Sequence, residues 1–118
     1  MARRILKYGL IAGALLFVLI QFVQPDRTNP TVDPSATFEA VVKPSPQVAS
    51  LVRRACYDCH SHETTWPWYS RIAPVSWLVA GHVREGRRKL NFSQWNLFGA
   101  EMSRARLRAA CEEVREGG

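Results

Sequence analysis

The stretch CYDCHSHETTWPWYS, residues 56–70, contains two cysteines three positions apart, a histidine directly after them and a group of aromatic residues around a proline. A Cys-x-x-Cys pair serves three chemistries in proteins: thiol–disulfide exchange, zinc coordination and covalent attachment of haem. Each chemistry needs a different setting for the pair, so the surrounding sequence discriminates among them.

A helix is predicted to lead into the cysteine pair. Ser45 is suited to be its N-cap and Pro46 its first residue. One helical stripe then collects the residues Val48, Leu51, Val52, Ala55, Cys56 and Cys59. The pair therefore ends an amphipathic helix and is expected to face its buried side. Thiol oxidoreductases place the pair at a helix N-terminus, where the thiolate is stabilised, so this setting disfavours thiol exchange.

Structural zinc needs four ligands, usually supplied by two closely spaced pairs. Cys56 and Cys59 are one such pair, and Cys111 with either His62 or His82 would have to complete the site. The sequence has no second C-x-x-C or H-x-x-x-H pair, which weakens this interpretation.

Covalent haem attachment fits every residue of the motif. Thiols at positions i and i+3 of a helix share a face and can form thioethers with the two haem vinyl groups. The histidine that follows is thereby brought under the iron. On this interpretation Cys56 and Cys59 bind haem c covalently, and His60 is the proximal axial ligand of the iron.

The N-terminal region has the layout of an export or anchor segment. An apolar run, residues 8–23 (YGLIAGALLFVLIQFV), follows the basic residues Arg3, Arg4 and Lys7. This pattern is typical of either a cleaved secretory signal or a membrane anchor. No A-x-A cleavage pattern follows the run, which favours an uncleaved transmembrane anchor with the rest of the chain exported.

Prolines then mark a predicted linker. Residues 24–45 are rich in Pro, Asp, Thr and Ser, which favours an extended spacer, although Thr37–Lys43 could form a short strand or a turn of helix. The predicted boundaries are therefore 1–23 for the anchor, 24–45 for the linker and 46–118 for the haem-binding domain.

The remaining pattern is helical, so the predicted fold class is all-α. A helix begins at Pro74, and its apolar stripe is Val75, Leu78, Val79, His82 and Val83. Another runs from about Ala100 to Glu116, on whose apolar stripe Cys111 is expected to pack as a small hydrophobe. Ser93 is expected to cap a short turn between them.

Composition limits the size and the partners of the protein. A chain of 118 residues has room for one small domain beside its apolar N-terminus. Part of the net charge of +6 lies before the apolar run, so charge gives little support for a nucleic-acid partner. The group Arg84, Arg87, Arg88 and Lys89 is interpreted as a solvated helix end, with docking to an acidic redox partner or haem propionates as the alternative.

A haem pocket also needs apolar walls that exclude water. Candidates are Trp66, Trp68, Tyr69, Ile72 and Trp77, although each of these could equally belong to an ordinary aromatic core. By analogy with cytochromes, the backbone carbonyl of Pro74 is a candidate acceptor for the imidazole Nδ1–H of His60.

The residues around the motif also show a family resemblance. Residues 54–95 read RACYDCHSHETTWPWYSRIAPVSWLVAGHVREGRRKLNFSQW and resemble the bacterial haem-binding domain family related to cytochromes c. The shared motifs are C-Y-D-C-H-S, P-W-Y-S, A-P-V-S-W and L-N-F-S-x-W, and QFVQPDRTNP at 21–30 is similar to the family's linker. The resemblance implies a small cytochrome c-like haem domain behind an N-terminal transmembrane helix, with Cys56, Cys59 and His60 as its haem-binding residues.

In similar proteins the segment C-E-E-V-x-x-G, here 111–117, continues into a Met-Pro loop and another helix, whereas this chain stops at Gly118. The domain is therefore expected to be truncated at its C-terminus and to lack the usual distal methionine. His82 is the leading substitute as distal axial ligand, with a packed core histidine as the alternative. Met102 is less suitable because it lies off its helix's apolar stripe, and His62 is too near His60 to reach the opposite haem face.

Together these patterns predict a membrane-anchored periplasmic c-type haem protein. Its function is expected to be one-electron transfer rather than enzyme catalysis, with a redox partner protein in the periplasm or inner membrane. A haem-based sensor or peroxidase-like module with an open sixth site is the alternative, although no peroxidase-like distal Arg-His pair is evident. A tethered module that haem chiefly stabilises is a third possibility. The expected location is the bacterial inner membrane, with one N-terminal span and the domain facing the periplasm.

Overall fold

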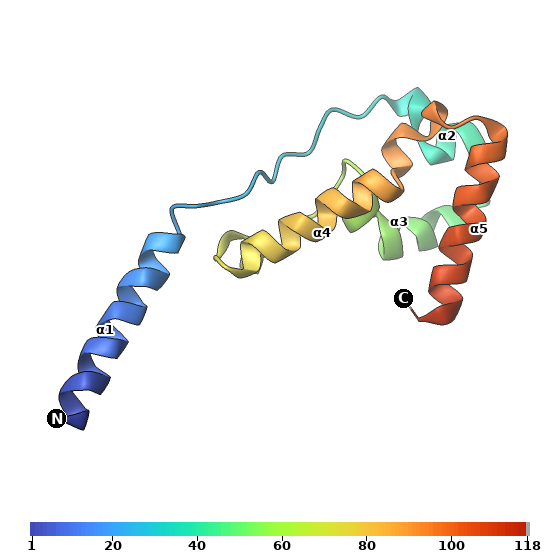
Figure 1. Cartoon of the computed structure of the whole chain (residues 1–118). Coiled ribbons are helices and arrows are strands. Elements are labelled where there is room, and N and C mark those ends of the chain that lie inside the picture. Colours follow the sequence, from blue (N-terminus) through green and yellow to red (C-terminus); the bar gives the residue numbers. More distant parts are fainter. Residues whose placement is uncertain (118) are drawn as a thin grey trace. The chain divides into compact units, whose positions relative to one another are not determined.

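The computed structural model describes residues 1–117, and those residues are helical or irregular, without a strand. Five α-helices and three short 3₁₀ helices follow one another along the chain (Figure 1). They are α1 (Ala2–Ile20), η1 (Pro34–Ala36), α2 (Phe38–Val42), α3 (Pro46–His60), η2 (Trp68–Arg71), α4 (Val75–Lys89), η3 (Phe92–Leu97) and α5 (Ala100–Glu116). The all-α prediction is confirmed.

The helix ends follow local sequence signals. Ser45 caps α3 by accepting a hydrogen bond from the Val48 N–H at 3.4 Å, and Pro46 is its first residue, as predicted. Gly117 ends α5 in the left-handed region at φ 78°, where glycine has no Cβ penalty. The cap before η3 differs from the prediction: the Asn91 side chain, not Ser93, accepts a hydrogen bond, from the Ser93 N–H.

The chain divides into two compact units, which we describe separately. The N-terminal unit consists of Met1–Thr28 and Trp66–His82, and the motif unit consists of Asn29–Thr65 together with the chain from Val83 onward. Helix α4 contributes its first half to the N-terminal unit and its second half to the motif unit.

Helix α1 has no buried residue. Within residues 1–117, no helix combines the length and the apolar character that crossing a membrane requires. The predicted N-terminal span therefore has no support from the described structure.

Polar contacts join α1 to a distant segment of the N-terminal unit. The Gln21 side-chain amide donates to the Ala73 carbonyl at 3.1 Å and accepts from the Ala73 N–H at 2.9 Å. Beyond it, the Trp77 indole N–H donates to the Val23 carbonyl at 2.6 Å. The end of α1 is thus fixed to the segment around the start of α4.

An aromatic cluster forms the core of the motif unit. Phe38, Tyr57, Phe92 and Trp95 are buried together, with Val52, Cys56, Leu90, Phe98 and Leu107 packed against them. Trp95 is fully buried, and its ring centroid lies 5.0 Å from that of Phe38 and 5.6 Å from that of Phe92. Stacked and edge-on ring pairs at this separation add to the stabilisation from apolar burial.

The motif unit begins inside the segment expected to be a spacer. Helix α2 resolves the ambiguity over Thr37–Lys43 in favour of a helix, and it packs against η3. Its Phe38 lies in the core, while the carboxylate of Glu39 accepts a hydrogen bond from the Tyr57 hydroxyl and pairs with Arg53 at 3.0 Å. Residues before 46 therefore contribute a core side chain and a polar tie to α3.

The predicted buried stripe of α4 is partly wrong. Val75, Leu78 and His82 are exposed, whereas Ser76, Ala80 and Val83 are buried. The buried face is thus made largely of small side chains, which a hydrophobicity pattern does not reveal.

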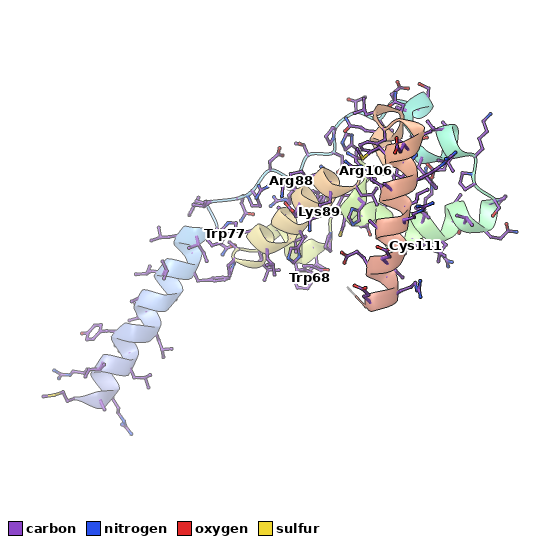
Figure 2. The ribbon with its side chains drawn as sticks, turned by 45° about the vertical axis from the view of Figure 1, so that its right-hand side comes forward. Trp68, Trp77, Arg88, Lys89, Arg106 and Cys111 are labelled. Atoms are coloured by element: carbon purple, nitrogen blue, oxygen red, sulfur yellow. The ribbon has the colours of Figure 1, made fainter. Side chains whose placement is uncertain are left out.

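The predicted faces of two other helices also differ from the structure. On α3, Val52 and Cys56 contact the core, but Leu51 and Cys59 are exposed. On α5, Leu107 packs against the core while Cys111 is exposed, so the expected packing of Cys111 is wrong (Figure 2). Each helix buries a narrower stripe than its sequence pattern indicates.

Candidate functional site

The cysteine pair and its histidine occupy the last turn of α3. Cys56 is partly buried against the aromatic core, and Cys59 is exposed. Residues three apart on a helix share a face, so both thiols lie on one side of the turn that ends at His60. The structure brings the three predicted haem-binding residues together.

His60 is held by backbone carbonyls at the C-terminal end of α4. Its Nδ1 lies 2.9 Å from the Gly86 oxygen and 3.1 Å from the Leu90 oxygen. A carbonyl oxygen can only accept a hydrogen bond, so Nδ1 carries the proton and donates it. In the neutral ring, Nε2 then keeps its lone pair. Nε2 is the atom that would ligate a metal in this tautomer. The predicted acceptor, the Pro74 carbonyl, is wrong, because Nδ1 is engaged by the carbonyls of Gly86 and Leu90 instead.

Gly86 allows α4 to approach the motif closely. A Cβ atom built at Gly86 would lie 2.4 Å from the backbone oxygen of Cys59 and 3.1 Å from its carbonyl carbon. No side chain fits at such a distance from another backbone. The missing side chain therefore lets the Gly86 carbonyl come within hydrogen-bonding distance of His60.

Arg87 holds the loop that follows the motif. Its Nε donates to the Ser61 carbonyl at 2.7 Å, and one terminal nitrogen donates to the Thr64 hydroxyl at 3.0 Å and the Asn29 side chain at 2.7 Å. Hydrogen bonds from a charged donor are stronger than neutral ones. Arg87, which the sequence suggested would be solvated, is instead part of the structure around the site.

His62 is a buried structural residue. Its Nε2 lies 2.9 Å from the amide nitrogen of Asn91, which can only donate, so Nε2 accepts. Its backbone N–H donates to the Ser93 hydroxyl at 2.9 Å. Burial, with a smaller contribution from the Arg87 charge, lowers the pKa of His62 and keeps the ring neutral. These contacts hold His62 in place, and its relation to the haem stays a prediction.

The structure disfavours the two alternative chemistries of the cysteine pair, thiol exchange and structural zinc. Burial and the neighbouring Cys59 raise the pKa of the Cys56 thiol, whereas a thiol-exchange nucleophile needs a lowered one. Within residues 1–117, no group of three or more His, Cys, Asp and Glu side chains is arranged to hold a metal ion, so a four-ligand zinc site is not formed there.

The family model described as "haem-binding domain" matches residues 15–118. The chain belongs to this family. Searches of curated proteins and of solved structures found no match. The haem-binding assignment therefore rests on the family and on the site itself.

The donor set of this haem-binding domain fits its cofactor. Cys56 and Cys59 supply two thiols on one helix face, and His60 presents a ring whose Nδ1 proton is already engaged. Cys56 also lies against the aromatic core, which gives the site one apolar side. The residues that would hold haem are thus positioned by α3, by the C-terminal end of α4 and by the core.

Other predicted haem contacts lie outside the motif unit. The proposed wall residues from Trp66 to Trp77 and the candidate distal ligand His82 belong to the N-terminal unit. Trp68 and Trp77 are exposed, and His82 is exposed rather than buried as its stripe indicated. Met102, on α5, is also exposed. Their roles at the haem stay predictions.

Sequence reasoning missed two contributors to the site, Gly86 and Leu90, and interpreted a third, Arg87, as solvated. For Gly86 the sequence does offer a signal, because a glycine inside a helical pattern often marks a close approach of another backbone. Leu90 acts through its carbonyl oxygen, which no side-chain pattern can reveal.

Proposed function

We propose that the protein is a membrane-anchored periplasmic c-type haem protein that carries one electron at a time. The observation that carries the proposal is the hydrogen bonding of His60, whose Nδ1–H is donated to the carbonyls of Gly86 and Leu90. Such a ring is oriented before any metal arrives, and the thiols of Cys56 and Cys59 precede it in the same turn.

Bound haem would supply an iron that cycles between ferric and ferrous states. The chain's own residues do the rest. Cys56 and Cys59 would attach the porphyrin, His60 would present Nε2, and the aromatic core would exclude water on the Cys56 side. The two carbonyl acceptors of Nδ1 would make the imidazole a better donor to the iron and so favour the ferric state.

Covalent attachment is the first test. After expression with a c-type maturation system, haem is expected to stay on the denatured polypeptide, because thioether bonds survive unfolding. Cys56→Ala and Cys59→Ala are each expected to lower the fraction retained, and the double variant to abolish it. Cys111→Ala, on the exposed face of α5, is the matched control and should retain haem fully. Complete extraction of haem from the unmutated protein by acid acetone would contradict the proposal.

His82 is our candidate for the distal ligand. His62 is engaged by Asn91, which leaves His82 as the remaining histidine of the sequence. His82→Ala is expected to convert a low-spin spectrum to high-spin and to admit carbon monoxide, with haem still attached. Met102→Leu, which removes the other candidate, should leave the spectrum unchanged. A His82→Ala protein that stays low-spin would exclude His82 as the ligand.

The same spectra test the alternative function. A haem-based sensor or peroxidase-like module needs an exchangeable sixth position. If the reduced unmutated protein binds carbon monoxide readily, the sixth site is open and this alternative replaces electron transfer.

We further propose that the N-terminal apolar segment holds the domain at the bacterial inner membrane, on its periplasmic side. Support comes from residues 8–23, whose apolar side chains, such as Leu10 and Phe17, are exposed on α1 behind three basic residues. Fractionation should find the protein in the membrane, resistant to carbonate extraction. A soluble mature form beginning near Gln24 would show a cleaved signal instead.

A further inference from the structure

The segment 68–78 of the N-terminal unit exposes an unusual amount of apolar surface. Trp68 is 75% exposed, and Tyr69, Ile72, Val75 and Leu78 are also exposed. Trp68 and Tyr69 pack edge-to-face with ring centroids 5.7 Å apart, so they present one joined aromatic surface. Exposed apolar patches of this kind mark sites that contact a membrane, another protein or a ligand such as the haem for which Trp68, Tyr69 and Ile72 are candidate wall residues.

This surface is attached to the end of the apolar N-terminal helix. The Gln21 amide exchanges two hydrogen bonds with the Ala73 backbone, and the Trp77 indole donates to the Val23 carbonyl. Arg27 adds a hydrogen bond to the Ser70 carbonyl at 3.0 Å. Figure 2 shows Trp77 beside the C-terminal end of α1. Phe22 and Val23, just after α1, also expose apolar side chains.

The composition of the patch suits the interface between lipid tails and water. Tryptophan and tyrosine concentrate at the headgroup level of bilayers, where an apolar ring and a polar N–H or O–H are both accommodated. Arg71 is exposed within the same segment and can reach lipid phosphate groups. The hydrogen bonds to Gln21 and Val23 place the patch next to the end of α1, so the surface of a bilayer entered by α1 is the occupant that its position favours over a partner protein.

We propose that residues 68–78 form an interfacial dock that rests in the phospholipid headgroup region where α1 leaves the bilayer. This inference rests on the proposed membrane anchoring. The segment from Trp68 to Leu78 then lies in the membrane surface, so the N-terminal unit is seated on the membrane and does not swing on a free tether.

Photocrosslinking to lipid tests the dock in the full-length holoprotein. p-Benzoylphenylalanine is placed singly at Trp68, at Phe17 on α1 or at Leu97 on η3, a 69% exposed residue of the motif unit. Each protein is reconstituted in vesicles of phosphatidylethanolamine and phosphatidylglycerol and irradiated, and lipid adducts are identified by mass spectrometry. Lipid adducts are expected at the Trp68 and Phe17 positions, with only background at Leu97.

The three positions separate the possible failures. An adduct at Phe17 without one at Trp68 would overturn the dock and leave the anchor intact. No adduct at Phe17 would overturn the anchoring on which the dock depends. Equal amounts of lipid adduct at Leu97 and Trp68 would show non-specific contact with lipid. Crosslinked protein dimers at Trp68 would assign the patch to a second copy of the chain. Either result would overturn the dock.

Discussion

A Gly86→Ala variant is expected to lose much of its stability and to attach haem poorly. The new Cβ would lie 2.4 Å from the Cys59 carbonyl oxygen, and because helical backbone fixes the positions of both atoms, neither can rotate away. Overpacking of a close contact typically costs about 1–3 kcal/mol, and the last turn of α3 or of α4 must move to relieve it. That movement also withdraws the Gly86 carbonyl from His60, so the proximal ring loses an acceptor.

Gly81 provides the matched control on the same helix. A Cβ at Gly81 would meet no atom within 4 Å, so Gly81→Ala relieves the cost of an interior glycine. Its free energy of unfolding is expected to rise by about 0.5–1 kcal/mol. Urea unfolding followed by circular dichroism, together with the yield of covalently bound haem, measures both variants. A Gly86→Ala protein as stable as the unmutated one would show that the close approach of α4 to Cys59 does not exist.

Removing the central aromatic ring should have the largest effect on stability. Trp95 is fully buried against Phe38, Phe92 and Phe98. Tryptophan-to-alanine changes in a core cost about 3–5 kcal/mol. A single core as small as that of the motif unit rarely supplies more than about 3–5 kcal/mol of stability, so Trp95→Ala is expected to leave the motif unit largely unfolded without haem.

Leu97→Ala is the control, because Leu97 lies on the same short helix η3 but is largely exposed. Its circular dichroism and urea midpoint should remain close to those of the unmutated protein. A Trp95→Ala protein with an unchanged midpoint would mean that the aromatic cluster is not the core. Phe38→Leu, which keeps the apolar volume, is expected to fall between the two variants.

The features that could be predicted from the sequence are those that depend on residues close together in the chain. Helix α3 follows from Ser45, Pro46 and the spacing of its apolar residues, and the cysteine motif was correctly placed at its end. The family resemblance was confirmed by the match to the haem-binding domain. These features depend on neighbouring residues or on a short motif.

Features that depend on long-range packing were not predictable. The acceptors of His60 lie 26 and 30 residues further along the chain and act through backbone oxygens. The buried face of α4 uses Ser76 and Ala80, whose small size matters more than their hydrophobicity. Phe38 lies in the proline-rich segment 24–45, where no hydrophobic periodicity marks it as a core residue rather than a spacer residue.

The Gly86 carbonyl has a second donor, since it also accepts from the Leu90 N–H at 2.9 Å. His60 is therefore attached to the turn where α4 is most prone to fray. When that turn opens, the Leu90 amide becomes open to hydrogen exchange and the imidazole loses its orientation in the same event. The lifetime of the His60 geometry is set by how often one helix end unwinds.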